Sequence, residues 1–264
     1  MATMVSFHAH PDDECIGCGG VIRKAFEEGH RVVLVVATRG EQGEVPEGFL
    51  ADGEELWQRR VTETQASAAI LGAQRTEFLG YLDSGMMGTP ANDRPGSFWT
   101  APVEEAAGKL AALLREEKAD VLTCYDDNGG YGHPDHIQVH RVGLRAAELA
   151  GIRRVYQNTI NRDHILRSRK ALAEQAAAAG IEMPDLSERD EFGQPESVIT
   201  AAVDVTPYVD VKRRAMRAHA SQISEESFFL AMPDAAFRYA FGTEWFIRAG
   251  QGPGITETDL LAGL

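Results

Sequence analysis

Residues Val5–Ala37 contain two predicted strands and the helix between them; their sequence is VSFHAHPDDECIGCGGVIRKAFEEGHRVVLVVA. Val5–His8 is a short strand candidate, followed by a glycine-rich turn and a helix near Gly20–Glu28. Arg31–Ala37 is a continuous run of mostly β-branched residues, which is typical of a strand that is buried on both faces. Two strands separated by one helix predict a βαβ unit with parallel strands and a right-handed crossover.

The alternation of strands and helices continues to residue 160. Further helices are expected over Glu54–Leu71, over Val103–Glu117 and from Pro134 onward. Further strands are expected over Thr76–Leu79, Asp120–Tyr125 and Arg154–Ile160. Alternation of this kind predicts an α/β fold in which helices cover a mostly parallel sheet.

The pattern weakens beyond residue 160. The expected elements are a helix over Ile165–Ala179, a polar loop over Glu182–Pro195, a strand over Val198–Val205, a helix over Tyr208–His219 and a last strand over Glu244–Ile247. No clear linker separates them from the first part. The sequence therefore predicts a single domain over residues 1–264, with a core over 1–160 and a C-terminal elaboration over 161–264.

Composition excludes several classes of protein. Lys plus Arg is 26 and Asp plus Glu is 40, which gives a formal net charge of −14. Nucleic-acid binding needs a basic surface, and an acidic chain is repelled by anionic membranes. The longest strongly apolar run, Val32–Ala37, is too short to span a bilayer, and Met1–Phe7 shows no secretory signal. Three cysteines favour a reducing compartment. We expect a cytoplasmic protein with a small-molecule partner, and the sequence leaves open whether it forms a homo-oligomer.

Polar side chains with metal-binding chemistry follow the first predicted strand. His10 is followed within five residues by three carboxylates, those of Asp12, Asp13 and Glu14. Imidazole nitrogen and carboxylate oxygen are ligands that Zn²⁺ accepts. Pro11 stiffens the turn between them. A capped helix start would explain one or two of these acids but not the whole cluster.

A second cluster, Tyr131-Gly132-His133-Pro134-Asp135-His136, follows the strand that ends near Tyr125. Its two imidazoles lie three residues apart near a helix start, so one can bind a metal while the other faces a substrate. Ordinary hydrogen-bonded histidines at a loop–helix junction are the alternative. Ligands of parallel sheets bind beyond the carboxyl ends of the strands, so both clusters are expected at one edge. Together they predict a mononuclear metal hydrolase site.

Other polar and glycine-rich positions point less specifically to a function. His8 is expected in the core or behind the site, and His219 could reach the site but has no partner nearby in sequence. Cys15 and Cys18 are expected to pack under the loop. Gly17–Gly20 superficially resembles a dinucleotide-binding turn, but the second strand does not end in the acid that this motif needs.

The two clusters, Ala9–Glu14 and His133–His136, resemble those of the LmbE-like (PIG-L) family of zinc-dependent N-acetylglucosaminyl deacetylases. The likeness covers most of residues 4–160 and is patchy afterwards. It also includes Thr38–Glu44, Arg60, Glu63, Tyr81–Met86, Asn128–Tyr131 and Thr256–Leu261. The last three stretches look like the mycothiol-pathway branch in particular.

The resemblance implies a Rossmann-like α/β sandwich and a metal-dependent N-deacetylase that holds one Zn²⁺ per chain. It implies that His10, Asp13 and His136 bind the metal and that Asp12 is the general base. Two nitrogens and one carboxylate leave an open position on zinc for water, which agrees with this implied role.

The resemblance also implies roles for residues around the metal. His133 would stabilise the oxyanion or protonate the leaving amine, with Asp135 as its orienting partner and as the group that holds up its pKa. Tyr131 would lie on the oxyanion side. Arg60 and Asp83 would contact the sugar.

Three alternatives stay open at this point. One is a zinc amidase that acts on a mycothiol S-conjugate or a natural-product intermediate. Another is a nucleotide-binding oxidoreductase built on the Gly17–Gly20 turn, and the third is a non-catalytic sugar-binding module, which the filled base and acid positions disfavour. Specificity for the group attached to the sugar is expected in Gly88–Pro102 and Glu182–Glu196.

Overall fold

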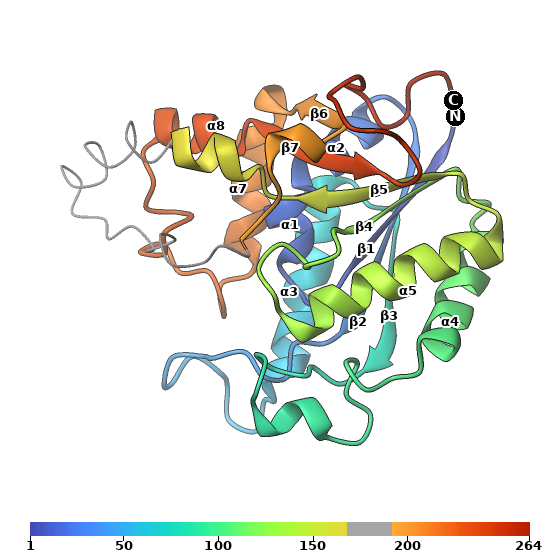
Figure 1. Cartoon of the computed structure of the whole chain (residues 1–264). Helices are drawn as coiled ribbons and strands as arrows, with labels where there is room; N and C mark the ends of the chain where they lie inside the picture. The colour runs from blue at the N-terminus through green and yellow to red at the C-terminus, as the bar shows by residue number, and fades with distance from the viewer. Residues whose placement is uncertain (168–191) are drawn as a thin grey trace.

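The computed structural model describes residues 1–167 and 192–264. The described part contains one seven-stranded sheet in the order β3-β2-β1-β4-β5-β7-β6 (Figure 1). Strands β1 to β5 are parallel, β7 is antiparallel to β5, and β6 is antiparallel to β7. The strands are β1 Thr3–His8, β2 Arg31–Thr38, β3 Arg75–Tyr81, β4 Val121–Tyr125, β5 Arg154–Thr159, β6 Ala201–Asp204 and β7 Thr243–Arg248. The order 3-2-1-4-5 is that of a Rossmann-type sheet, so the predicted fold class is confirmed.

Helices cover both faces of the sheet (Figure 1). They are α1 Asp13–Gly17, α2 Gly19–Glu27, α3 Leu56–Leu71, α4 Val103–Glu116, α5 Pro134–Ala150, α7 Val209–Ala218 and α8 Asp234–Phe241, with 3₁₀ turns η1 Pro90–Asp93, η2 Glu196–Val198 and η3 Thr206–Tyr208. Val5 and Phe7 of β1 pack in one hydrophobic cluster with α4 and α5, whereas Met4 packs in another with α2 and α7. Alternate residues of a strand point to opposite faces, so these two clusters lie on opposite faces of the sheet. A third, smaller cluster contains Leu34 and Val36 of β2 and Ala68 of α3.

The central strands are buried on both faces, as their sequence predicts. Val32–Ala37 is buried throughout, and Val5 of β1 pairs with Val33 of β2 in parallel register. The edge strand β3 is longer than the expected Thr76–Leu79, and most of its residues are only half-buried. An edge strand has one free side and a weaker apolar signal, which explains the shorter prediction.

The C-terminal elaboration shares the core of the first part. Met216 and Phe246 belong to the same hydrophobic cluster as Met4. A buried ion pair joins α7 to β7, with Lys212 Nζ 2.6 Å from Glu244 Oε1. The strand expected over Val198–Val205 is shorter than predicted, because a 3₁₀ turn occupies its start. Residues 162–167 are helical; the rest of the helix expected over Ile165–Ala179 and most of the loop expected over Glu182–Pro195 lie outside the described residues.

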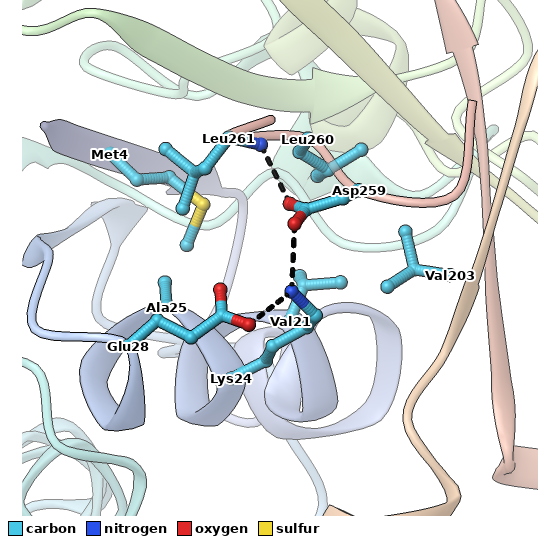
Figure 2. A pocket seen from close by; sticks show the side chains of 9 residues that line it. All are labelled: Met4, Val21, Lys24, Ala25, Glu28, Val203, Asp259, Leu260 and Leu261. Carbon is cyan, nitrogen blue, oxygen red and sulfur yellow. Dashed lines mark hydrogen bonds and ion pairs between the residues drawn. The ribbon is translucent and has the colours of Figure 1, made fainter. Parts of the chain in front are cut away.

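The end of the chain packs against α2 at the amino ends of the strands (Figure 2). Lys24 Nζ lies 2.6 Å from Glu28 Oε1 and 2.9 Å from Asp259 Oδ2. The hollow between these residues holds only about 10 Å³, which is room for about one water molecule. It therefore cannot receive a substrate. Among the described helices, none combines the length and hydropathy that a bilayer span requires.

Candidate active site

The two polar clusters lie at the switch point of the sheet. Strands β1 and β4 are neighbours, but β1 continues to β2 on one side and β4 continues to β5 on the other. Such a reversal leaves a crevice beyond the carboxyl ends of the two strands. Residues 10–14 follow β1, and residues 131–136 follow β4 and begin α5. The sheet thus brings together the two clusters that the sequence placed at one edge.

Three donor atoms from the two clusters face one another. His10 Nδ1 lies 3.3 Å from His136 Nε2 and 3.5 Å from Asp13 Oδ2. His136 Nε2 lies 3.4 Å from the same carboxylate oxygen. Tetrahedral ligands about 2.0–2.2 Å from a zinc ion would be about 3.3–3.6 Å apart. The three residues therefore fit a single metal ion as they stand.

The other ring nitrogen of each imidazole is hydrogen-bonded. His136 Nδ1 lies 3.1 Å from the Gly129 carbonyl oxygen, and His10 Nε2 lies 3.1 Å from Asp135 Oδ2 and 3.4 Å from Asp83 Oδ1. Because carbonyl and carboxylate oxygens only accept, these nitrogens donate. When the rings are neutral, the nitrogens that face Asp13 then carry lone pairs. Two lone pairs and a carboxylate oxygen at such distances suit a cation between them, and outer hydrogen bonds of this type are typical of metal-binding histidines.

The carboxylates around the site also favour a cation. Burial alone would lower the pKa of His10, but Asp83, Asp13 and Asp135 outweigh it and raise that pKa well above its usual value. Burial would raise the pKa of Asp13, but His136 and His10 outweigh it and hold the pKa well below its usual value. The site is therefore ready to hold positive charge among ionised carboxylates.

His133 is an alternative to Asp13 as the third metal ligand, because a nitrogen of its ring lies within 4.8 Å of nitrogens of His10 and His136. Its Nδ1 accepts the Asp135 main-chain N–H at 3.1 Å as the N-cap of α5. In a neutral imidazole with an accepting Nδ1, the proton resides on Nε2. A protonated nitrogen cannot bind a metal, so the geometry favours Asp13 as the third ligand and leaves His133 Nε2–H as a donor.

The carboxylate of Asp135 does not orient His133, contrary to the expectation from the sequence. It accepts from His10 Nε2, from the Ser84 main-chain N–H at 2.9 Å and from the Ser84 hydroxyl. Burial, together with the charges of His10 and His136, lowers the pKa of His133 to about 3. Asp135 and Asp83 do act to raise this pKa, but burial, His10 and His136 outweigh them, so the expectation that Asp135 holds the pKa up is not met.

Asp12 lies beside the metal ligands in an unusual backbone conformation. Its φ is 95°, in the left-handed region that few residues other than glycine adopt. Arg60 Nη2 lies 3.2 Å from Asp12 Oδ2, and the same guanidinium donates to the carbonyls of Pro11 at 2.7 Å and Gly40 at 2.8 Å. Burial raises the pKa of Asp12 to about 6, although Arg60 acts in the opposite direction. A buried carboxylate with such a pKa suits a general base.

The remaining predicted site residues surround the same centre. The Tyr131 hydroxyl lies 3.4 Å from His136 Nε2, and burial raises the pKa of Tyr131. Asp83 is buried and accepts main-chain N–H groups of Gln42 at 3.2 Å and Gly85 at 2.8 Å. Sugar contact by Asp83 and by Arg60 stays a prediction, and each side chain also has partners inside the protein.

A model of the PIG-L family, described as GlcNAc-PI de-N-acetylase, matches residues 5–147. The chain belongs to the PIG-L family. The resemblance inferred from the two motifs is thereby confirmed, and with it the enzyme class, an N-deacetylase.

Relatives of this PIG-L chain match it over nearly its whole length. A protein of Acidothermus cellulolyticus is 38% identical over 99% of this chain and 95% of its own length. A protein of Geodermatophilus obscurus is 40% identical over 97% of this chain and 96% of its own. Both are named 1D-myo-inositol 2-acetamido-2-deoxy-alpha-D-glucopyranoside deacetylase.

Solved structures show the same fold at lower identity. N,N'-diacetylchitobiose deacetylase from Pyrococcus horikoshii matches with a TM-score of 0.59 and 23% identity, covering 93% of this chain and 83% of that one. A deacetylase from the biosynthesis pathway of teicoplanin matches with a TM-score of 0.62 and 17% identity, covering 95% and 100%.

The glycine-rich turn of this PIG-L chain is not a nucleotide site. Glu244 accepts the main-chain N–H groups of Gly20 at 2.7 Å and Val21 at 2.8 Å, so a carboxylate already occupies the start of α2. A Cβ atom on Gly20 would lie 2.4 Å from Val205. The glycine therefore serves close packing of the C-terminal part, and the two N–H groups are not free to bind phosphate.

Sequence reasoning missed several residues that support the site. Ser84 shows no motif that links it to Asp135, and Ser67 shows none that links it to Glu14. His219, which could only be said to be within possible reach, lies 2.6 Å from Glu14 Oε1. The expectations for three others are met: His8 is buried behind the site, and Cys15 and Cys18 are buried free thiols.

Proposed function

We propose that the protein hydrolyses the acetamide of an N-acetylglucosamine-type sugar conjugate and releases acetate and the free amino sugar. One Zn²⁺ would be held by His10, Asp13 and His136. The observation that carries this proposal is the triangle of three donor atoms 3.3–3.5 Å apart, with Asp12 beside it. The relatives named as deacetylases of an inositol-linked acetamido sugar support the same class of substrate.

The metal, when bound, supplies a Lewis acid that polarises the amide carbonyl and lowers the pKa of a water molecule. Asp12 takes the proton of the attacking water. Burial raises the pKa of its carboxylate to about 6, so the base is ionised at neutral pH and still accepts a proton readily. Arg60 holds the side chain through its contact with Asp12 Oδ2.

Two neutral donors would stabilise the oxyanion that forms when water attacks the carbonyl. His133 offers its Nε2–H, because its Nδ1 accepts a main-chain N–H. Tyr131 offers its hydroxyl, whose raised pKa keeps it protonated. Donors aimed at a developing negative charge are worth about 10²–10³ in rate each.

The leaving amine also needs a proton. A neutral His133 with a pKa of about 3 is a poor source of one at neutral pH. Asp12 carries a proton after the attack of water, and a carboxylic acid with a pKa of about 6 can release it to the amine. We infer that Asp12 serves both as base and as acid, whereas His133 acts as a hydrogen-bond donor.

The group attached to the sugar would extend into a cavity of about 360 Å³ beyond β2 and β3. Asp83 links this cavity to the metal-binding residues, because it contacts His10 and also the Gln42 main-chain N–H. Guanidinium, carboxylate, amide and indole groups are typical of sites that bind hydroxyl-rich molecules. The lining residues are Arg39, Glu41, Gln42, Glu55, Leu56, Trp57, Leu82 and Arg94.

Acetate release from a panel of N-acetylated amino-sugar conjugates tests the proposal. We expect zinc-loaded protein to release stoichiometric acetate from a conjugate with a polyol aglycone, and Asp12→Asn to release almost none. S-conjugate amides of the same amino sugar are included as the competing substrates. Cleavage of those amides without acetate release from any N-acetyl conjugate would contradict the proposal.

A further inference from the structure

A buried chain of hydrogen bonds connects the C-terminal elaboration to Asp12. His219 follows α7 directly and is fully buried. Its Nε2 lies 2.6 Å from Glu14 Oε1, and the Ser67 hydroxyl donates to the same oxygen at 2.5 Å. The other oxygen of Glu14 accepts the main-chain N–H of Asp12 at 3.0 Å. His219 and Asp12 are therefore joined through the two oxygens of one carboxylate.

The hydrogen bond from the Asp12 main-chain N–H to Glu14 is made at a strained backbone position, Asp12 itself. Asp12 has a φ of 95°, and its carbonyl accepts the N–H groups of Cys15 at 3.1 Å and Ile16 at 3.2 Å as α1 begins. Left-handed residues other than glycine persist where the surroundings hold them. The hydrogen bond to Glu14 holds the N–H side of Asp12, and the helix start holds its carbonyl side. The direction of the Asp12 carboxylate depends on both.

His219 has no other polar contact through its ring in the part of the chain that the structure describes, since its Nδ1 is buried without a hydrogen-bond partner. Burial would lower the pKa of His219, but Glu14 outweighs it and raises the pKa. The hydrogen bond of this ring is thus directed to Glu14, while the charges of Asp12 and Glu63 also raise its pKa.

The segment that carries His219 is clamped to the core. The main-chain N–H and the hydroxyl of Ser221 donate to the two oxygens of Glu63 on α3, at 2.9 and 2.6 Å. Gln222 Nε2 donates to the Glu44 carbonyl, 3.0 Å away, in the loop after β2. These contacts give His219 a defined position under the α1 turn.

We propose that His219 is a positioning residue for hydrolysis: through Glu14 it holds Asp12 in the left-handed conformation that aims its carboxylate at the reacting water. The inference rests on the proposed function of Asp12 as the base. It assigns part of the catalytic geometry to the C-terminal elaboration, whose described residues include none of the proposed metal ligands and not the proposed base.

Two amide variants at one position form a matched test. Glutamine can place its Nε2 where His219 Nε2 lies, whereas asparagine is shorter and cannot reach Glu14. We expect His219→Gln to keep most of the wild-type kcat. We expect His219→Asn to lower kcat about 10–100-fold with KM and zinc content unchanged, because small misplacements of a catalytic group cost this much. Equal kcat values for the two folded variants would overturn the inference.

A milder variant covers the case in which His219→Asn does not fold. Ser67→Ala removes the second donor to the same Glu14 oxygen and is expected to lower kcat by a smaller factor. Lys212→Met is the control, because it breaks a buried ion pair on α7 that does not touch Glu14 or Asp12. It should lower the melting temperature and leave kcat unchanged. A kcat loss in Lys212→Met as large as that in Ser67→Ala would overturn the inference.

A double-mutant cycle separates this inference from the proposed function. If His219 acts through Asp12, then Asp12→Asn and the double variant Asp12→Asn/His219→Asn should have the same kcat. Additive losses would overturn the inference even when Asp12→Asn alone abolishes activity. Full activity of Asp12→Asn would instead contradict the proposed base, and with it the premise of the inference.

Discussion

His10 and Asp135 form a buried hydrogen bond in which Nε2 lies 3.1 Å from Oδ2. The carboxylate accepts, so the His10 ring donates from Nε2, and in its neutral form it keeps the lone pair of Nδ1 toward Asp13 and His136. Asp135 therefore sets the tautomer of a metal-facing imidazole. Its neighbour in sequence, His133, receives only the main-chain N–H of Asp135.

Loss of a metal ligand should remove the metal. His136→Ala deletes one corner of the donor triangle, and we expect zinc affinity to fall by at least about 100-fold, more than the loss of an outer hydrogen bond costs. His30→Gln is the control, because His30 accepts the Ala2 N–H near the amino end of β1, at the other end of the strand from the metal-binding residues. Metal content after dialysis checks the result. Full occupancy in His136→Ala would reject the ligand assignment.

Asp83 should affect both metal and substrate. Its Oδ1 lies 3.4 Å from His10 Nε2, so Asp83→Ala is expected to weaken zinc binding about 10-fold. The predicted sugar contact adds a second effect, a higher KM that persists at saturating zinc. Zinc titration followed by kinetics at full occupancy separates the two. Unchanged KM at saturating zinc would leave Asp83 with the metal role alone.

Asp12 should control the acidic limb of the pH profile. The base works when ionised, and burial raises the pKa of Asp12 to about 6. We therefore expect kcat/KM to fall as pH decreases through about 6. Asp12→Asn should lower kcat about 10²–10⁴-fold and retain the metal. Asp120→Asn is the control, because Asp120 lies at the amino ends of β1 and β4 and accepts the Thr3 N–H there. Wild-type kcat in Asp12→Asn would contradict the assignment.

His133 should influence the rate without changing how kcat/KM depends on pH. Its pKa of about 3 keeps it neutral throughout the working range, so its contribution is a hydrogen bond to the oxyanion. His133→Ala is expected to lower kcat about 10²–10³-fold. The profile of kcat/KM against pH is the measurement. A pH profile that differs from wild type above pH 7 in this variant would show that His133 works as an acid.

The ion pair of His219 with Glu14 should make stability depend on pH. Glu14 raises the pKa of His219 above 6.5, so the stabilisation is complete below pH 6.5 and is lost as pH rises through the raised value. Burial would raise the pKa of Glu14, but His219 outweighs it and lowers the pKa from 4.5, so stabilisation is also lost as pH falls through that lowered value.

The melting temperature of wild type minus that of His219→Gln measures this contribution. We expect the difference to be largest between pH 4.5 and 6.5, the two reference values of the pair, and to shrink on either side. A difference that stays constant as pH rises above 6.5 would exclude a charged His219 in the folded protein.

Local patterns were sufficient for the sheet and for the location of the site. The buried run Val32–Ala37 and the helix start at Pro134 each lie within one element, so their periodicity and breakers are visible in sequence. The meeting of the two polar clusters could also be predicted, because parallel strands end at one edge of a sheet. The short helix α1 was missed because Gly17 and Gly19 interrupt its pattern.

The sequence by itself determined which side chains have metal chemistry and which strands deliver them, since both properties follow from residue type and from neighbours a few positions apart. Only the tertiary structure decided the pairings. The Asp135 carboxylate contacts His10, 125 residues away, whereas His133, two residues away, is met only by the Asp135 main-chain N–H. Glu14 meets His219 across 205 residues. Such contacts depend on how helices pack on the sheet and on which rotamers that packing allows. They therefore cannot be predicted from the spacing of residues along the sequence.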